Sequence, residues 1–320
     1  MVNGIGNILV TGGAGFIGST LAETLINSNT IVVVIDNFNN YYSPILKEKN
    51  IEAVIKKPNY KLYRGDICDK DLVKEIFDKN KIDCVVHIAA RAGVRPSLED
   101  PLEYVKSNIY GTINILENMK EHNVKKIVFA SSSSVYGNCI AEKFSEDLKV
   151  TEPISPYAAT KSACEQFLYT YSKLYDMQAL CLRFFTVYGP RQRPDLAIRK
   201  FIELIEKDEP IPVFGDGTTM RDYTYIDDIV DGIIGAINYT KTKYEIINLG
   251  GGSPVTLNEM ISTIEEVLGK KAIIDRLPMQ PGDVNRTVSD ISKAKNLLGY
   301  CPKTTFKEGI KKFIEWRMYS

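Results

Sequence analysis

Two side chains, Tyr157 and Lys161, have the types and the spacing needed for proton transfer. They lie in the segment SPYAATK, residues 155–161. Pro156 suits the first turn of a helix, because its missing N–H would have no partner there. The predicted helix places Tyr157 and Lys161 on one face, four residues apart. A neighbouring ammonium group favours the phenolate and lowers the pKa of a tyrosine, so Tyr157 is a candidate acid and base for a substrate hydroxyl.

The same spacing also occurs on ordinary helices, as a surface lysine beside a half-buried tyrosine. The interpretation therefore depends on the rest of the chain, and first on its N-terminal end. A short apolar strand over 7–11 is followed at once by the glycine-rich turn GGAGFIG at 12–18, a helix, and a strand over 31–35 that ends at Asp36. Glycines at these positions allow a tight turn and close approach of the backbone to a pyrophosphate.

An acidic residue at the end of the second strand can bind the ribose hydroxyls of adenosine and would repel a 2′-phosphate. Asp36 occupies this position, 18 residues after Gly18, so we predict NAD rather than NADP as the cofactor. Asn108 is predicted to support the cofactor pocket, although an amide on a helix surface explains it as well. The predicted cofactor-binding residues are Gly12, Gly15, Phe16, Ile17, Asp36, Asn37, Asp66, Ile67, Ala89, Ala90, Asn108, Tyr157 and Lys161.

Apolar runs alternate with amphipathic helical stretches through the first half of the chain, which predicts an α/β fold with a doubly wound parallel Rossmann sheet. The glycine turn, Ala89-Ala90 and the segments 131–134 and 184–189 all follow predicted strands, so they should converge at the carboxyl edge of that sheet. His87 lies inside a strand and is predicted to be a core residue.

Residues 1–187 are expected to form the NAD-binding domain, with a later strand contributed by about 224–250. Residues 188–320 should mainly form a smaller, discontinuous C-terminal substrate-binding domain. A chain of 320 residues is long enough for this arrangement.

The composition excludes several classes of function. Forty basic and forty acidic residues give a formal net charge of zero, which argues against a broad surface for nucleic acid or anionic membrane. Six scattered cysteines without a CxxC pair indicate reduced thiols in a cytoplasmic protein. Two histidines make a histidine metal cluster implausible, so no metal is expected. Neither a signal peptide nor a membrane span is indicated.

Several further motifs resemble the extended short-chain dehydrogenase/reductase family, and within it the NAD-dependent epimerases and dehydratases of nucleotide sugars. The matching segments, in order along the chain, are GGAGFIG at 12–18, SSSSVYG at 131–137, YAATK at 157–161, RDYTYIDD at 221–228 and PGDVNRTVSDISKA at 281–294. The closest resemblance is to UDP-glucuronate 4-epimerases, through DNFNNYY at 36–42, AARAGVR at 89–95 and RFFTVYGPR at 183–191.

This resemblance implies NAD-dependent 4-epimerisation of a UDP-sugar, UDP-glucuronate to UDP-galacturonate. Tyr157 would take the proton of the sugar 4-hydroxyl while C4 gives a hydride to NAD, and Lys161 would hold the ribose at the nicotinamide end. Ser132 would lie beside the 4-oxygen, with Ser133 or Ser134 as the alternative register, and Ser133 would also contact the substrate. The 4-keto sugar would then turn over and take the hydride back on its other face, so NAD would stay tightly bound.

A substrate carboxylate needs a binding group, because a 4-keto hexuronate is a β-keto acid and can lose carbon dioxide. Arg193 and Thr186 are the candidates, since a guanidinium can hold a carboxylate with two parallel hydrogen bonds and fix its plane. Arg193 could instead bind a pyrophosphate oxygen or a dimer partner, and Arg95 is the second candidate for the carboxylate.

The resemblance also assigns the nucleotide end of the substrate. Arg221 would pair with the diphosphate, Asp283 would anchor the ribose or its loop, and Val213 with Phe214 would line the uracil. Gln280 stands where related enzymes often have an arginine on the diphosphate, which weakens the case for a second phosphate clamp.

Other functions remain open at this point. A 4-epimerase of a neutral UDP-hexose or UDP-N-acetylhexosamine differs only in the group that faces C6. Related decarboxylases and dehydratases carry carboxylates where Ser133 and Ser134 stand, which argues against those reactions. A non-enzymatic NAD sensor would have no use for Tyr157 and Lys161. Family members commonly form homodimers through two helices, here about 101–121 and 157–175, but the apolar spacing of these helices equally fits burial against the sheet.

Overall fold

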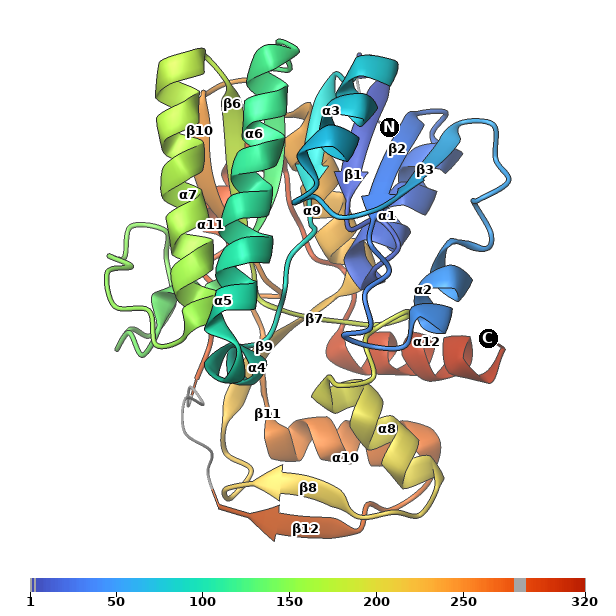
Figure 1. Cartoon of the computed structure of the whole chain (residues 1–320). Helices are drawn as coiled ribbons and strands as arrows, with labels where there is room; N and C mark the ends of the chain where they lie inside the picture. Colours follow the sequence, from blue (N-terminus) through green and yellow to red (C-terminus); the bar gives the residue numbers. More distant parts are fainter. Residues whose placement is uncertain (1, 3, 279–285, 320) are drawn as a thin grey trace.

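The computed structural model, which describes residues 2, 4–278 and 286–319, is built on a seven-stranded parallel sheet (Figure 1). The strand order β10-β6-β5-β4-β1-β2-β3 reverses its direction of growth beside β1, as in a doubly wound fold. The predicted α/β Rossmann architecture is therefore confirmed. The strands are β1 (Asn7–Thr11), β2 (Ile31–Asp36), β3 (Tyr60–Arg64), β4 (Cys84–His87), β5 (Lys126–Ser132), β6 (Gln178–Phe184) and β10 (Tyr244–Leu249).

Both faces of this sheet are covered by helices, because alternate residues of its apolar strands point to opposite sides. Ile8 and Val10 of β1 pack with α1 and α9 in one core, whereas Leu9 packs with α3, α6 and α7 in the other. The segment 101–121, predicted as one helix, is α5, a π-helical turn (η1) and α6. The helices of this part are α1 (Phe16–Asn27), α2 (Pro44–Ile51), α3 (Lys70–Lys79), α4 (Val94–Glu99), α5 (Pro101–Tyr104), η1 (Val105–Tyr110), α6 (Gly111–Glu121), α7 (Pro156–Tyr175) and α9 (Ile226–Asn238).

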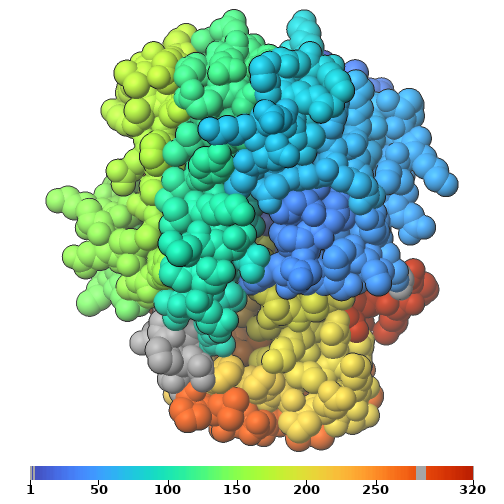
Figure 2. Space-filling view, in the orientation of Figure 1, coloured from blue at the N-terminus to red at the C-terminus, as the bar shows by residue number. Residues whose placement is uncertain are grey.

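Most of the remaining elements lie beyond the carboxyl edge of the large sheet, at the bottom of Figures 1 and 2, whereas α11 packs against β10 and α9. They form a three-stranded sheet, β11-β9-β7, and a two-stranded sheet, β12-β8. The chain returns to the large sheet through α9 and β10, and the division at residue 187 into two domains stays a prediction. These elements are β7 (Thr186–Tyr188), α8 (Ala197–Glu206), β8 (Ile211–Phe214), β9 (Met220–Tyr225), β11 (Pro254–Thr256), α10 (Leu257–Leu268), β12 (Ile274–Leu277), α11 (Ser292–Leu298) and α12 (Phe306–Met318).

The start of α7 fixes where the candidate acid/base lies. Ser155 is the N-cap and its hydroxyl accepts a hydrogen bond from Ala158 N, while Pro156 occupies the first turn as predicted. Tyr157 therefore lies at the N-terminal end of α7, next to the strand end that carries Ser132. Among the described residues, no helix combines the length and the apolar character needed to cross a membrane.

Candidate active site

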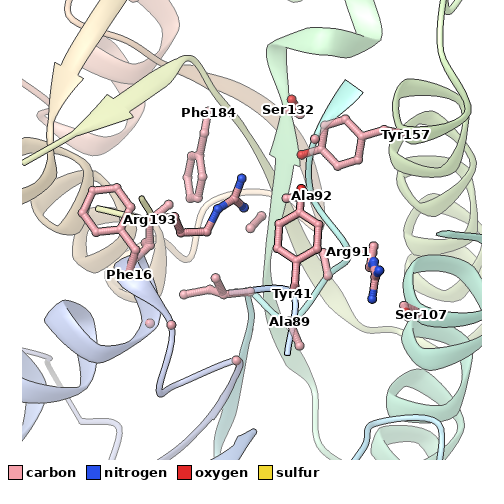
Figure 3. A pocket seen from close by; sticks show the side chains of 18 of the residues that line it. Phe16, Tyr41, Ala89, Arg91, Ala92, Ser107, Ser132, Tyr157, Phe184 and Arg193 are labelled. Carbon is pink, nitrogen blue, oxygen red and sulfur yellow. The ribbon is translucent and has the colours of Figure 1, made fainter. Parts of the chain in front are cut away.

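A cavity of about 500 Å³ lies at the carboxyl edge of the large sheet (Figure 3). It collects segments that are far apart in sequence, because the ends of the parallel strands meet there. Most of the predicted site residues line it: Gly12, Gly15, Phe16, Ile17, Asp36, Asn37, Asp66, Ile67, Ala89, Ala90, Ser132, Tyr157, Lys161, Thr186 and Arg193.

The glycine turn forms one end of the cavity and leaves no room for side chains. Gly12 has a φ of +71°, and a Cβ there would lie 2.8 Å from Ala89 N. A Cβ on Gly18 would lie 2.2 Å from Gly12 O. Backbone is therefore exposed where a phosphate would approach, and α1 begins immediately after the turn. These observations fit a dinucleotide at this end of the cavity.

Asp36 has structural partners as well as a place in the cavity wall. Its carboxylate accepts hydrogen bonds from Ala14 N (3.0 Å) and Phe38 N (2.9 Å), so it fixes both the glycine turn and the following loop. Lys47 Nζ lies 3.8 Å from the same carboxylate in a buried ion pair that sequence reasoning missed. A lysine in α2 gives no sequence signal of its own, since most lysines on helices face water.

Asp66 and Asn37 meet beside this end of the cavity. Asn37 Nδ2 donates to Asp66 Oδ2 at 2.8 Å, and Cys68 N donates to Asp66 Oδ1 at 2.8 Å. Partial burial opposes ionisation of Asp66, but these hydrogen bonds outweigh it and hold the pKa below the usual range. Asp66 is therefore a carboxylate in the cavity wall that can accept further hydrogen bonds.

Tyr157 and Ser132 face each other at the other end of the cavity, as Figure 3 shows. Burial raises the pKa of Tyr157, while a hydrogen bond with Ser132 and the charge of Arg193 act in the opposite direction. The expected net lowering of the Tyr157 pKa is therefore wrong for the chain without a bound cofactor. Desolvation of the phenolate outweighs the neighbouring cations.

Lys161 is held in place by the sheet rather than by Tyr157. Its ammonium donates to Ala130 O at 2.6 Å and lies 4.7 Å from the centre of the Phe129 ring. Burial lowers the pKa of Lys161 to about 8, against the opposing effect of nearby groups that include Glu165. The pKa of this ammonium thus lies close to neutral pH. Lys161 lines the cavity one helical turn from Tyr157.

The four serines at the end of β5 differ in whether they line the cavity. Ser131, Ser132 and Ser134 line the cavity, whereas Ser133 does not, so its predicted substrate contact has no support from the cavity wall. Ser132 Oγ donates to Ser134 Oγ at 3.1 Å and accepts from Ser134 N at 3.2 Å. Ser133 is the first residue of the 3-10 helix η2 (Ser133–Tyr136).

Arg193 points into the cavity toward Tyr41 and Tyr157 (Figure 3). Its guanidinium makes two hydrogen bonds to Asp195, at 3.0 and 2.8 Å, and its side chain is 17% exposed. Tyr41 lies between two guanidinium groups, with Arg193 5.1 Å and Arg91 5.0 Å from its ring centre. Sequence reasoning missed Tyr41 and Arg91 as cavity residues, although both belong to segments that follow strands.

Several predicted substrate residues lie outside the cavity wall. Val213 is fully buried in the core, so its side chain cannot line a uracil pocket. Arg95 stacks on Phe214, with its guanidinium carbon 4.9 Å from the ring centre, and this contact joins α4 to β8. Arg221 lies on β9 and donates to Met220 O at 3.0 Å.

Asn108 supports the cavity from behind. It is 2% exposed, its Oδ1 accepts from Arg91 N at 2.7 Å, and its Nδ2 donates to Arg91 O (3.0 Å) and Thr160 Oγ1 (2.9 Å). The alternative of a surface amide is therefore excluded. His87 is a core residue as predicted, hydrogen-bonded to Thr11 Oγ1 at 2.6 Å. Asp283 and Gln280 lie outside the described residues.

The family follows from comparison with known proteins. A family model described as GDP-mannose 4,6 dehydratase matches residues 9–313. The chain belongs to this family of NAD-dependent epimerases and dehydratases. The family name alone leaves the reaction open. Positions 133 and 134 of this chain carry serines.

Individual relatives of this epimerase/dehydratase are similar over almost their full length. UDP-glucuronate 4-epimerase of Thermodesulfobacterium geofontis is 47% identical, over 98% of this chain and 96% of the relative. Among solved structures, UDP-glucuronic acid 4-epimerase of Bacillus cereus in complex with UDP-glucuronic acid and NAD has a TM-score of 0.91, 39% identity and coverage of 98% and 99%. UDP-glucose 4-epimerase of Thermotoga maritima with UDP-glucose has a TM-score of 0.90 at 33% identity, with the same coverage.

Burial of the Lys161 ammonium is predicted to lower the free energy of unfolding of the protein. The folded pKa of about 8 lies below the ordinary 10.5, so the unfolded chain binds more protons between these values. The penalty is therefore full below about pH 8 and disappears as the pH rises to about 10.5. Lys161→Met should raise the free energy of unfolding at pH 7 by about 1–2 kcal/mol, after allowing for the lost bond to Ala130 O.

Denaturant unfolding of the cofactor-free protein at pH 7 and at pH 10 measures this effect. Lys173→Met, at an exposed position of the same helix, is the control and should change stability little at either pH. A Lys161→Met protein that is less stable than its parent at pH 7 would contradict the assigned penalty.

Proposed function

We propose that the protein is an NAD-dependent 4-epimerase that interconverts UDP-glucuronate and UDP-galacturonate. The observation that carries the proposal is the position of Arg193, which points into the same cavity as the Tyr157–Ser132 pair. That cavity starts at a dinucleotide-type glycine turn, so one space can hold a cofactor and an anionic sugar side by side. The names of the relatives support the same activity.

Bound NAD would supply the oxidant, taking a hydride from C4 of the sugar and later returning it to the opposite face. The glycine turn would hold the pyrophosphate. Asp36 would accept hydrogen bonds from the adenosine ribose hydroxyls, because its two backbone hydrogen bonds leave further lone pairs on the carboxylate oxygens. Lys161 would donate to the ribose at the nicotinamide end, on the cavity side of its bond to Ala130 O.

Tyr157 would exchange a proton with the 4-hydroxyl, and Ser132 would bind the same oxygen. Because burial raises the Tyr157 pKa in the cofactor-free chain, the phenolate needs additional positive charge before it can act as a base near neutral pH. The nicotinamide cation adds to the effect of Arg193 and would supply that charge. Proton removal would therefore be coupled to the presence of the oxidised cofactor.

Arg193 and Thr186 would bind the C6 carboxylate. Asp195 already aligns the guanidinium through two hydrogen bonds, so the group is held in one plane before substrate enters. A carboxylate fixed in that plane can be kept out of line with the ketone π-system, which slows loss of carbon dioxide from the 4-keto acid.

The nucleotide would extend toward β8 and β9. Phe214 offers an aromatic face to the uracil, but Arg95 covers that ring in this structure and would have to move aside. Arg221 would bind the diphosphate from β9, and Asp283 would anchor the ribose or its loop.

A neutral UDP-hexose is the second candidate substrate. The charge of Arg193 is balanced by Asp195, so this pair adds no net charge to the cavity before substrate binds. The similarity to a UDP-glucose 4-epimerase supports this candidate as well. The two substrates are distinguished by direct assay.

Proton NMR of the purified protein with UDP-glucuronate, after a check for bound NAD, tests the proposed function. We expect UDP-galacturonate to rise to a plateau without any UDP-pentose, because C4 inverts while the carboxylate is protected. A UDP-pentose product would mean that the 4-keto acid loses carbon dioxide, and it would contradict the proposed protection of the carboxylate. Turnover of UDP-glucose with none of UDP-glucuronate would overturn the proposed substrate.

The role of Arg193 predicts a selective loss of affinity. Arg193→Ala should weaken binding of UDP-glucuronate by about 30-fold or more, the value of a charge-assisted pair of hydrogen bonds, and that of UDP-glucose only slightly. Isothermal titration calorimetry on the NAD-loaded protein gives both affinities without turnover. Arg95→Ala is the comparison variant and should change the affinity for both ligands equally, because Arg95 covers the ring proposed for the uracil that both ligands share. Equal losses for the two sugars in Arg193→Ala would contradict the carboxylate role.

We also propose a homodimer formed through the surface of α4, α5, η1 and α7. These elements pack against each other and lie on one face of the molecule (Figures 1 and 2). Large apolar side chains are exposed along them: Leu98 (53%), Leu102 (78%), Val105 (45%), Phe167 (37%) and Leu174 (67%). Exposed large apolar side chains on elements that pack together are typical of a surface that contacts another protein. A cytoplasmic location is proposed with it, from the scattered free cysteines.

Light scattering after size exclusion tests the dimer. The parent protein should elute at twice the mass of one chain, and Leu102→Glu should shift it toward the monomer, because a charge would be desolvated in the interface. Ile140→Glu, at a fully exposed residue outside these helices, is the control and should leave the mass unchanged. A monomeric parent, or a Leu102→Glu protein that stays dimeric, would argue against this surface.

A further inference from the structure

A buried ion pair lies behind the reacting groups. Glu165 of α7 is 3% exposed and Arg183 of β6 is 1% exposed. Arg183 donates from Nε to Glu165 Oε1 at 2.9 Å and from Nη2 to Oε2 at 2.7 Å. Two apolar residues of similar volume are often as stable as such a pair, so stability alone is a weak reason for its presence.

The carboxylate of this pair holds the strand end that carries the catalytic serine. Ser131 Oγ donates to Glu165 Oε1 at 2.6 Å. Ser131 is also the register partner of Arg183 across β5 and β6. Because Ser132 is the next residue, the carboxylate limits how far the Ser132 hydroxyl can move relative to α7.

The same carboxylate acts on Lys161, which lies one helical turn earlier on α7. The titratable groups that interact with Lys161 are Cys164 and Glu165 of α7, Cys181 of β6 and His87 of β4. Burial raises the pKa of both thiols and lowers that of His87 to about 3, so these three groups are neutral near pH 7. Among these described groups, Glu165 supplies the negative charge that opposes the desolvation of the ammonium.

Other elements hold the pair in a single arrangement. The Arg183 guanidinium carbon lies 4.7 Å from the centre of the Tyr136 ring, and Tyr136 OH donates to Asn248 Oδ1 at 2.7 Å. Tyr244 OH of β10 donates to the backbone oxygen of Glu165 at 3.0 Å. The pair is thus fixed by β5, β6, β10, η2 and α7, all of which end or begin near the reaction centre.

We propose that Glu165 and Arg183 form a positioning pair for the reaction centre, in which the Glu165 carboxylate fixes Ser131, and through it Ser132, and lies one helical turn from Lys161. Neither side chain lines the cavity, so neither is a catalytic residue. The proposal rests on the proposed function, because it assigns the pair to the groups that would act on the sugar and the cofactor.

The double variant Glu165→Gln/Arg183→Met tests the pair without leaving a lone buried charge, which either single substitution would do. We expect kcat for epimerisation to fall about 100-fold with KM little changed, because Ser132 is no longer fixed. The basic limb of the pH profile should move to lower pH, because Lys161 loses the carboxylate that favours its charged form. Ser131→Ala should lower kcat without moving the basic limb.

Tyr244→Phe is the matched control, because it removes a contact to the backbone of Glu165 and leaves both charges in place. It should keep the parental basic limb, and thermal unfolding of every variant shows whether the fold is retained. A folded double variant with the parental kcat and basic limb would overturn the proposal. A Ser131→Ala protein with the parental kcat would overturn the link to Ser132.

A second measurement keeps this test independent of the substrate. NAD affinity, measured by calorimetry against pH, should fall as Lys161 loses its proton, and it should do so at lower pH in the double variant. If the parent does not turn over UDP-glucuronate, the proposed function fails, and the pH dependence of NAD binding still decides the role of the pair. Identical pH dependence in parent and double variant would contradict it.

Discussion

Burial of a lysine ammonium is the constraint on which the rest of the site depends. Lys161 is 3% exposed, and removing an ammonium from water costs several kcal/mol unless partners replace the lost hydration. The sheet supplies Ala130 O and the face of Phe129, and α7 supplies the carboxylate of Glu165. This carboxylate is itself balanced by Arg183, so one buried charge requires two more. The desolvation cost of Lys161 falls at the place where the proposed reaction needs a cation.

Desolvation also raises the pKa of Tyr157 in the cofactor-free chain. A buried phenolate is disfavoured, and the cations already present do not outweigh that cost. An additional positive charge in the cavity would change the balance, so the site is arranged to act once an oxidised cofactor is bound. Doubly wound topology makes this arrangement possible, because β1, β4, β5 and β6 all end at the cavity. The elements below that edge then complete the space in which a sugar would lie.

Local sequence predicted the parts of the structure that depend on short-range rules. The glycine turn, the strand that ends at Asp36, and the proline at the start of α7 each have a physical signature within about a dozen residues. Contacts between distant segments were not predictable in this way. Lys47 beside Asp36, Tyr41 between Arg91 and Arg193, and Arg95 on Phe214 all depend on how loops fold back over the sheet edge.

The errors have the same origin. Val213 was expected at the uracil, but strand alternation turns its side chain into the core. Ser133 was expected at the substrate; it is absent from the cavity wall to which Ser132 and Ser134 belong, so this contact stays a prediction. The pKa of Tyr157 was expected to be lowered because the sequence gives the spacing of a charge and not the cost of its burial.

In the proposed mechanism a hydride leaves C4 of the sugar and returns to the same carbon within the cavity. A decisive experiment uses UDP-glucuronate that carries deuterium at C4, with the reaction run in ordinary water and the product followed by NMR and mass spectrometry. UDP-galacturonate should keep the deuterium at C4. Product with a solvent proton at C4 would mean that inversion proceeds by proton exchange with water, and it would contradict the roles assigned to the cavity.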